Sequence, residues 1–427
     1  MRKTYQIVEY GSFVREKDIS GYTSLPKETF DAVETFVLTH KNKETEALEL
    51  MGISAKKGVG KIITAKNYVG VITMEDGTTI EILPKVYSDE TATIAKQKQL
   101  LIDMLKTLKN SPYKSLQTTN VNIEKISIFE VFIRMFIEEM FFIVKRGLQC
   151  SYETVQSNEM VFKGKMLFSN QIRNNFAHKE RCFIEYDEFN VNRVENKILK
   201  STLLYLYKMT TSLKNKNDIK TLLNSFVDVD FSVNYELDFS KIRPERNTKD
   251  YEIALAWSKI FLRGKSFTSF SGSQIAFALL FPMETLFESF VAAHMRKLLK
   301  GTGYSLSSQD RACHLFDEPN KKFLMRPDLV IKEKQQGITF IMDTKWKVLS
   351  DVKNHYGISQ TDMYQMYAYQ KKYLAKNVTL LYPYTEKMAM DKKIEFISKD
   401  GAVVKVKFVD VLNIKKSLSK IISDIDT

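Results

Sequence analysis

The spacing of hydrophobic residues changes twice along the chain. From residue 1 to about 110 it is typical of β-strands: residues 61–87, KIITAKNYVGVITMEDGTTIEILPKVY, hold β-rich runs joined by Asp76 and Gly77, a strong hairpin signal. We expect a β-meander there. From about 111 to 260 the hydrophobic residues lie three and four positions apart, most clearly in 126–148 and 191–213, which predicts a helical middle domain.

The last region alternates between the two patterns. A helix over 281–299 precedes strands over 323–331 and 338–347, and a helix over 361–373 precedes two more strands around Asp400-Gly401. This alternation predicts an α/β domain. The expected fold class is therefore α+β, with a β-rich domain at 1–110, a helical domain at 111–260 and an α/β domain at 261–427.

The charge of the chain favours a polyanionic partner. Sixty-four Lys and Arg residues against 51 Asp and Glu give a net charge of +13. Neutralising phosphates releases counterions, so nucleic acid is the first candidate partner. A basic surface without a specific partner is the plain alternative, because net charge mainly affects solubility and non-specific binding.

The sequence predicts a cytoplasmic protein outside the membrane. Glu9 and Arg15 interrupt any apolar leader, and three cysteines without a CxxC pair indicate neither a zinc site nor a disulfide framework. The apolar segment 128–148 contains charges at helical spacing, which favours a buried core helix over a membrane span.

A glycine-containing segment imitates a nucleotide-binding loop. Residues 56–63, KKGVGKII, would need Gly at position 55 and Ser or Thr at position 62 to make a phosphate loop, but Ala55 and Ile62 stand there. We expect a glycine turn between strands. Any use of ATP or GTP would have to come from another polypeptide.

Two aspartates and a lysine lie in the segment RPDLVIKEKQQGITFIMDTKWK, residues 326–347. An antiparallel hairpin centred between residues 335 and 336 places Asp328 opposite Asp343, with Lys345 on the same face. A slip of one residue would put one aspartate into the core. In this register the opposite face is apolar, with Phe323, Met325, Leu329, Ile331, Ile338, Phe340, Met342 and Trp346.

Opposed carboxylates repel each other unless a cation lies between them. Asp328 and Asp343 are hard oxygen ligands suited to Mg²⁺, or to Mn²⁺, and Lys345 would hold a water or stabilise phosphate charge. We expect these acids on the face turned away from the core. Ordinary surface salt bridges with neighbouring Arg and Lys residues are the alternative.

Two helices add candidate residues. The helix over 281–299 carries Glu284 and Glu288 at the margin of its apolar arc, and either could reach a metal from a helix packed on the sheet. The helix over 361–373 places Gln365 and Tyr369 four residues apart on one face. Solvated glutamates and core tyrosines are the plain interpretations of these positions.

The order of these residues resembles a known nuclease core. Glu288 on a helix, Asp328 after Arg-Pro, Asp343-Thr-Lys345 and the Gln365-Met-Tyr-Ala-Tyr369 helix resemble the PD-(D/E)xK nucleases. The segments GKMLFSNQIRNN and DEFNVNRVENKILKSTLLYL look like the McrC family, the nuclease subunit of McrBC-type restriction systems. The resemblance covers roughly 155–385, and the β-rich start looks like the amino-terminal part of longer members.

The resemblance implies a Mg²⁺-dependent endonuclease for modified double-stranded DNA that works with a McrB-like hexameric AAA+ GTPase. It assigns metal binding to Asp328 and Asp343, catalysis to Lys345, and a further catalytic and metal-binding role to Glu288. Support of DNA or of the active site falls to Gln365, Tyr369 and Arg326. The β-rich amino-terminal region is expected to dock to the partner and stimulate its GTPase activity.

Two rival functions fit parts of the sequence. A PD-(D/E)xK nuclease of DNA repair, or of another restriction system, would have the same acids and lysine. A non-catalytic activator of an AAA+ ring would use the nuclease domain as a scaffold, but such a scaffold would be expected to have lost one of Asp328, Asp343 and Lys345.

Overall fold

The computed structural model describes residues 3–39, 51–74, 76–89, 92–108, 126–243, 246–263 and 275–424. They form two compact units, which we call the sheet unit (1–128 with 266–427) and the helical unit (129–265). The chain is a mixed α+β protein, as predicted. Residues 109–125, the first part of the predicted helical domain, lie outside the described residues. The predicted three-domain division stays a prediction, and the structure groups its first and last regions into one unit.

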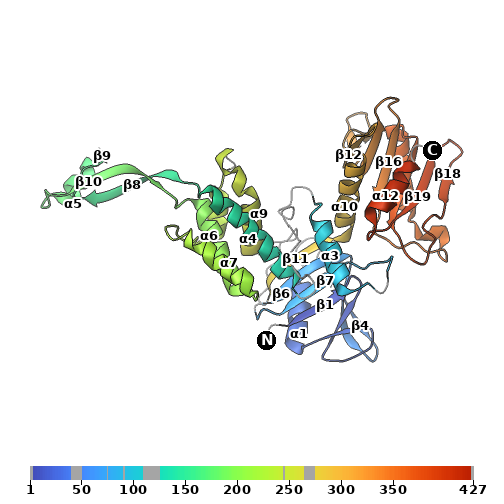
Figure 1. Ribbon diagram of the computed structural model, residues 1–427, viewed down its shortest axis with the longest axis horizontal. Helices are drawn as coiled ribbons and strands as arrows, with labels where there is room; N and C mark the ends of the chain where they lie inside the picture. Colours follow the sequence, from blue (N-terminus) through green and yellow to red (C-terminus); the bar gives the residue numbers. More distant parts are fainter. Residues whose placement is uncertain are drawn as a thin grey trace. The chain divides into compact units, whose positions relative to one another are not determined.

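Strands far apart in the sequence build the first sheet of the sheet unit (Figure 1). Its order is β1-β7-β6-β11, so β11, about 200 residues further along the chain, pairs with β6. Asp76 and Gly77 join β6 to β7 as an antiparallel pair, which confirms the predicted hairpin. The strands are β1 Thr4–Val8, β6 Tyr68–Met74, β7 Thr79–Leu83 and β11 Ile275–Pro282.

A second sheet, with order β3-β2-β5-β4, lies in the same region of the sequence. The predicted simple meander is wrong, because β1 pairs with β7 and β2 with β3 in parallel, and parallel pairs need crossover connections. Residues 57–59 form the turn between β4 and β5, which confirms the glycine turn. The elements are β2 Ser12–Arg15, β3 Thr23–Leu25, α1 Lys27–Thr39, β4 Met51–Lys56, β5 Gly60–Ala65 and α3 Ile94–Leu105.

Helices make the core of the helical unit, as the spacing predicts. Phe132 of α4 packs on Trp257 of α9, with ring centroids 5.8 Å apart, and both side chains are fully buried. The segment 128–148 therefore contains a core helix; within the described residues, none of the helices has the length and apolar character needed to cross a membrane. The helices are α4 Ile128–Arg146, α6 Val194–Met209, α7 Leu213–Asn224, α8 Tyr235–Lys241, η4 Arg246–Tyr251 and α9 Glu252–Arg263.

A β-structured arm, residues 151–190, projects from these helices (Figure 1). The prediction of helix throughout 111–260 is wrong here, because a long antiparallel ladder pairs β8 with β10 and alternate residues face opposite sides. The amide of Asn196 donates to the carbonyls of Gln149 and Val191, at 2.9 and 2.7 Å, and so joins the two ends of the arm. The arm contains β8 Ser151–Glu159, β9 Lys165–Met166, α5 Phe168–Asn175 and β10 Cys182–Asn190.

The carboxyl-terminal region contains a six-stranded mixed sheet of order β12-β15-β16-β17-β19-β18. Parallel pairing of β16 with β17 makes α11 their crossover, and α11 packs on the face that carries Val330, Ile341 and Leu380. The opposite face meets α10. The elements are α10 Met283–Leu298, β12 Tyr304–Ser308, β15 Leu329–Glu333, β16 Thr339–Thr344, α11 Gln360–Tyr373, β17 Asn377–Pro383, β18 Ile394–Ile397, β19 Val403–Val409 and α12 Ile414–Ser423.

Three smaller features complete this region. A two-stranded sheet joins β13 His314–Phe316 to β14 Lys322–Leu324, and the short 3-10 helix η5 spans Asn354–Gly357. Strand β17 was not predicted, although its run NVTLLYP is almost entirely buried. It lies at the centre of the sheet between β16 and β19, so it covers the edge of the strand that carries Asp343.

Candidate active site

The hairpin formed by β15 and β16 has the predicted register. Leu329 pairs with Met342, and the ladder continues to Lys332 with Thr339, so the paired residue numbers all sum to 671. Asp328 lies one residue before the first paired position and Asp343 one residue after its partner. Two assignments in the predicted apolar face are wrong: Phe323 belongs to β14 and is 70% exposed, and Met325 packs under α11 with Val330 and Ile341.

Asp343 is buried, contrary to the prediction that the acids avoid the interior. Its exposed fraction is 2%, and every residue of β16 is buried, because helices cover both faces of this sheet. Its Oδ2 lies 2.6 Å from Nζ of Lys345. Among the described residues, Oδ2 has no hydrogen-bond partner besides this lysine.

Asp328 is held by the strand opposite. Its Oδ2 accepts hydrogen bonds from the backbone N–H and the hydroxyl of Thr344, at 2.8 and 2.7 Å. Thr344 directly follows Asp343, so the carboxylate of Asp328 is fixed beside the other acid. The structure thus brings the two predicted aspartates together.

Both carboxyl groups are less acidic than an ordinary aspartate. Burial, and next the charge of Asp328, raises the pKa of Asp343 to about 7, although Lys345 opposes the shift. Burial also raises the pKa of Asp328, against the hydrogen bonds from Thr344. Paired acids with raised pKa values in a protein interior are a common signature of a functional site.

Lys345 lies between acids and the α11 helix. Its Nζ donates to Oε1 of Gln365 at 3.3 Å, and Nε2 of Gln365 donates to the hydroxyl of Tyr369 at 2.8 Å. Burial lowers the pKa of Lys345, but the charges of Asp343 and Asp362 outweigh it and the pKa is raised. Lys345 is therefore a protonated, oriented cation beside Asp343.

The glutamates of α10 have separate partners. Glu288 accepts two hydrogen bonds from Nε2 of Gln309, at 2.8 and 3.0 Å, and the backbone N–H of Gln309 donates to the carbonyl of Asp328 at 2.9 Å. Glu284 accepts from Asn67 at 2.6 Å. Glu288 is thus linked to Asp328 through one residue. Within the described part of the chain, no three acidic, histidine or cysteine side chains gather closely enough to hold a metal ion.

Arg326 is exposed, and its backbone lies within hydrogen-bonding reach of the Tyr369 hydroxyl. Burial raises the pKa of that hydroxyl to about 12, so Tyr369 stays protonated at neutral pH. Tyr369 is 4% exposed and belongs to the core under α11. It supports Gln365, and through it Lys345.

Comparison with known proteins identifies the family. The family model for the McrBC 5-methylcytosine restriction system component matches residues 63–383. This chain belongs to that McrBC family. No curated protein matched the sequence.

Solved structures from Thermococcus gammatolerans have the same fold as this McrBC-family chain. One is a half-complex from a tetradecameric assembly of McrB AAA+ hexamers with bound McrC: the match has 20% identity and a TM-score of 0.69, and covers 98% of this chain and 100% of the other. The second is the McrBC complex, with 21% identity and a TM-score of 0.50 over 70% and 88% of the two chains. At these identities the likeness concerns the fold alone.

A third acid of this McrBC-family chain, Asp362, was missed in the sequence. It lies 3.8 Å from Nζ of Lys345 and 3.3 Å from Nζ of Lys347, and its backbone N–H donates to the hydroxyl of Ser359, which caps α11. The spacing of Ser359 and Asp362 is a helix-start signal. Read together with Gln365 on the same helix, it could have placed Asp362 near the site.

The two aspartates fit a Mg²⁺ ion by their chemistry. The oxygen atoms are hard ligands, Oδ2 of Asp343 is buried beside Lys345, and burial opposes the negative charge that a cation would balance. Mg²⁺ commonly keeps several waters and binds one or two protein carboxylates together with substrate phosphate. Two aspartates therefore suffice as the protein ligands of a Mg²⁺ ion.

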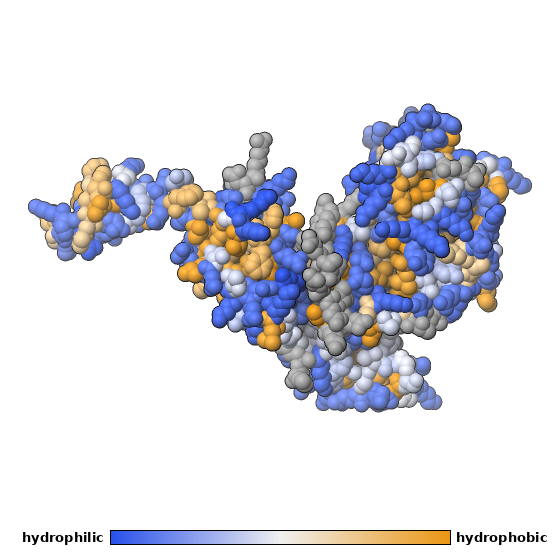
Figure 2. Space-filling view, in the orientation of Figure 1, coloured by the Kyte–Doolittle hydropathy of each residue, from blue (hydrophilic) through white to orange (hydrophobic). Residues whose placement is uncertain are grey.

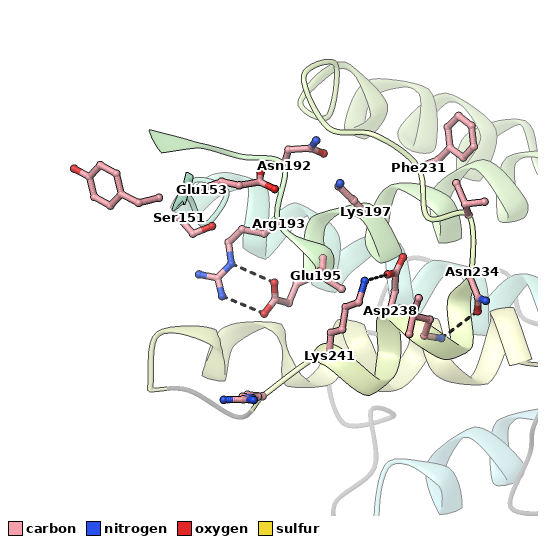
Figure 3. Close-up of a pocket in the computed structure, with 15 residues that line it drawn as sticks. Ser151, Glu153, Asn192, Arg193, Glu195, Lys197, Phe231, Asn234, Asp238 and Lys241 are labelled. Atoms are coloured by element: carbon pink, nitrogen blue, oxygen red, sulfur yellow. Dashed lines mark hydrogen bonds and ion pairs between the residues drawn. The ribbon is translucent and has the colours of Figure 1, made fainter. Parts of the chain in front are cut away.

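A pocket of about 580 Å³ lies elsewhere, in the helical unit at the base of the arm (Figure 3). Two of its cations are paired with its acids: Arg193 makes two hydrogen bonds to Glu195, and Lys241 lies 3.5 Å from Asp238. These pairs balance part of the positive charge that lines the pocket.

Proposed function

We propose that this chain is the Mg²⁺-dependent DNA endonuclease subunit of a McrBC-like restriction complex, with a nuclease core of the PD-(D/E)xK type. The buried pair Asp328 and Asp343 beside Lys345, at the end of β16, carries the proposal. Family membership and the basic charge of the chain support it.

The residues divide the work of hydrolysis among them. Asp328 and Asp343 would hold the metal ion, and Lys345, oriented by Gln365, would place a positive charge where the scissile phosphate becomes more negative. Bound Mg²⁺ would polarise the phosphate and lower the pKa of a water molecule. Glu288, linked to Asp328 through Gln309, would stabilise the metal-binding segment or take a water-mediated place beside it.

Titration with Mn²⁺ tests the metal site directly. Asp328→Asn is expected to weaken Mn²⁺ binding about tenfold or more, measured by calorimetry or electron paramagnetic resonance, because a neutral amide replaces a charged oxygen ligand. Asp317→Asn is the control, since Asp317 is an exposed acid paired with Lys372. Equal binding by wild type and Asp328→Asn would favour a non-catalytic scaffold.

The complex that we propose contains a McrB-like hexameric AAA+ GTPase, and its DNA substrate is modified and double-stranded. The arm is the surface that favours contact with this partner, because large exposed apolar patches mark interaction sites. Figure 2 shows apolar surface on the arm. Its exposed large hydrophobic side chains are Tyr152, Met160, Val161, Phe162, Phe168, Ile172, Phe176 and Phe189.

Docking through the β-rich amino-terminal region stays a prediction. Within the described residues between 3 and 108, the large hydrophobic side chains that are exposed are Tyr10, Leu38 and Ile94, fewer than on the much shorter arm. The arm therefore has the stronger physical case for partner binding.

Replacement of apolar residues on the arm tests this contact. Phe162→Ser with Phe176→Ser is expected to reduce stimulation of the partner's GTPase activity about tenfold or more, because each exposed ring would be buried in the complex. Phe231→Ser is the matched control, a ring 62% exposed in the same unit but outside the arm. Stimulation by the double variant at the wild-type level would exclude the arm as the contact.

A further inference from the structure

Trp346 is the point where three segments of the sheet unit meet. It follows Lys345 at the end of β16 and is 3% exposed. Its ring lies 5.1 Å from the ring of Phe287 on α10 and 5.7 Å from that of Tyr87, which comes after β7. Phe287 directly precedes Glu288. A shift of Trp346 would therefore displace both Lys345 and the segment of α10 that carries Glu288.

A buried acid from the first sheet holds this tryptophan. Nε1 of Trp346 donates to Glu9, with its two carboxylate oxygens 3.0 and 2.9 Å away. Glu9 comes directly after β1, and its own backbone N–H donates to the carbonyl of Leu83 at 2.9 Å. The backbone N–H of Lys85 donates to the same carboxylate at 3.0 Å. The carboxylate is thus fixed by the β1–β7 pair.

The carboxylate of Glu9 is costly where it lies. It is 1% exposed, and burial raises its pKa to about 7 although the hydrogen bonds from Trp346 and Lys85 lower it. A glutamine of the same shape could accept hydrogen bonds from both N–H groups with less desolvation. Stability alone therefore does not explain why a glutamate lies at position 9. A charged acceptor makes a stronger hydrogen bond to the indole N–H of Trp346 than a neutral one does.

We propose that Glu9 is a positioning residue for the cleavage site: it fixes Trp346, and through Trp346 it fixes Lys345, directly after β16, and the segment of α10 that carries Glu288. The inference rests on the proposed nuclease function and adds to it a mechanical link from the first sheet to the site. Glu9 and Trp346 are 337 positions apart in the sequence, so only the fold joins them.

The test measures single-turnover DNA cleavage by the complete complex with its GTPase partner, GTP, Mg²⁺ and modified DNA. Glu9→Ala and Trp346→Phe are each expected to slow cleavage about tenfold or more at unchanged DNA affinity, because small misplacements of catalytic groups are costly. Glu9→Gln should lose less activity than Glu9→Ala but should not reach the wild-type rate, because its amide oxygen still accepts the bond but is a weaker acceptor than a carboxylate.

A double-variant cycle tests whether Glu9 acts through Trp346. Glu9→Ala combined with Trp346→Phe is expected to be no slower than the slower single variant, because both remove the same bond. Asn67→Ala is the matched control: it breaks the bond to Glu284, which also joins the first sheet to α10, and should change cleavage less than about twofold.

Specific outcomes overturn the inference. Wild-type cleavage by Glu9→Ala would do so, as would fully additive losses in the double variant. If Glu9→Ala fails to fold, shown by its melting curve, the inference stands or falls on Trp346→Phe, which keeps an aromatic ring between Phe287 and Tyr87. Wild-type cleavage by an Asp343 variant would instead remove the proposed nuclease function, so the two failures are distinguishable.

Discussion

Asp343→Asn is expected to abolish DNA cleavage and, at the same time, to make the folded protein more stable at neutral pH. The amide keeps the shape of the side chain but removes a charged metal ligand. Metal ions contribute several kcal/mol to stabilising the transition state, so we expect a loss of roughly a thousandfold or more in the cleavage rate. The gel-based cleavage assay of the assembled complex measures it.

The gain in stability follows from the raised pKa of Asp343 in the metal-free protein. The carboxyl has a pKa of about 7 in the folded chain against 3.8 for an ordinary aspartate, and this shift already includes the attraction of Lys345. Between about pH 4 and pH 7 the folded state keeps a proton that the unfolded chain has lost. The free energy of unfolding of the wild type therefore falls as pH rises through this window.

Asp343→Asn has no carboxyl group to titrate at this position. Its gain in the free energy of unfolding over the wild type should therefore be small below pH 4 and complete above pH 7. Chemical denaturation at pH 5 and pH 8 without metal ions compares the two proteins. Asp317→Asn should show no such pH-dependent gain, since that acid is 66% exposed. An active Asp343→Asn variant, or one destabilised more at pH 8 than at pH 5, would contradict the account.

The register of the site could be predicted because it depends on local alternation. The apolar and ionic residues around Asp328 and Asp343 fit one pairing, and β15 and β16 adopt it. The burial of Asp343 could not be predicted in this way. It depends on β17 and on helices from distant segments that cover both faces of the sheet, and alternation within a hairpin says nothing of them.

Long-range contacts explain the other differences. Helical spacing left Glu284 and Glu288 equivalent, and their partners Asn67 and Gln309 come from different elements and separate them. No local pattern could have linked Glu9 to the site. In the arm, by contrast, the polar alternation of β8 was present in the sequence. It was overlooked because the segments on both sides have helical spacing, and helix was predicted for the whole region.

A variant of Lys345 should separate metal binding from phosphodiester cleavage at this site. Lys345→Met keeps most of the length of the side chain and removes its charge. We expect cleavage to fall by roughly a hundredfold to ten-thousandfold, because a positioned cation that stabilises developing charge is lost. Mn²⁺ binding should persist or tighten, since a positive charge 2.6 Å from Asp343 is gone.

The stability of Lys345→Met should change in the opposite direction to that of Asp343→Asn. Removing the lysine leaves the buried acid without its counter-charge, so the pKa of Asp343 rises further. As the pH increases past 7, the free energy of unfolding of the variant therefore falls below that of the wild type. At pH 5, where Asp343 is protonated in both proteins, this part of the difference disappears. Two inactive variants with opposite pH-dependent effects on stability cannot both owe their inactivity to unfolding.

Lys347→Met is the matched control for this variant. Lys347 is 53% exposed at its side chain and lies 3.3 Å from Asp362, so it carries the same charge two residues further on without touching Asp343. Its loss should alter cleavage only a few-fold and stability by less than about 1 kcal/mol. Wild-type cleavage by Lys345→Met would remove the lysine from the mechanism. Loss of Mn²⁺ binding in that variant would show that Lys345 instead builds the metal site by holding Asp343 in place.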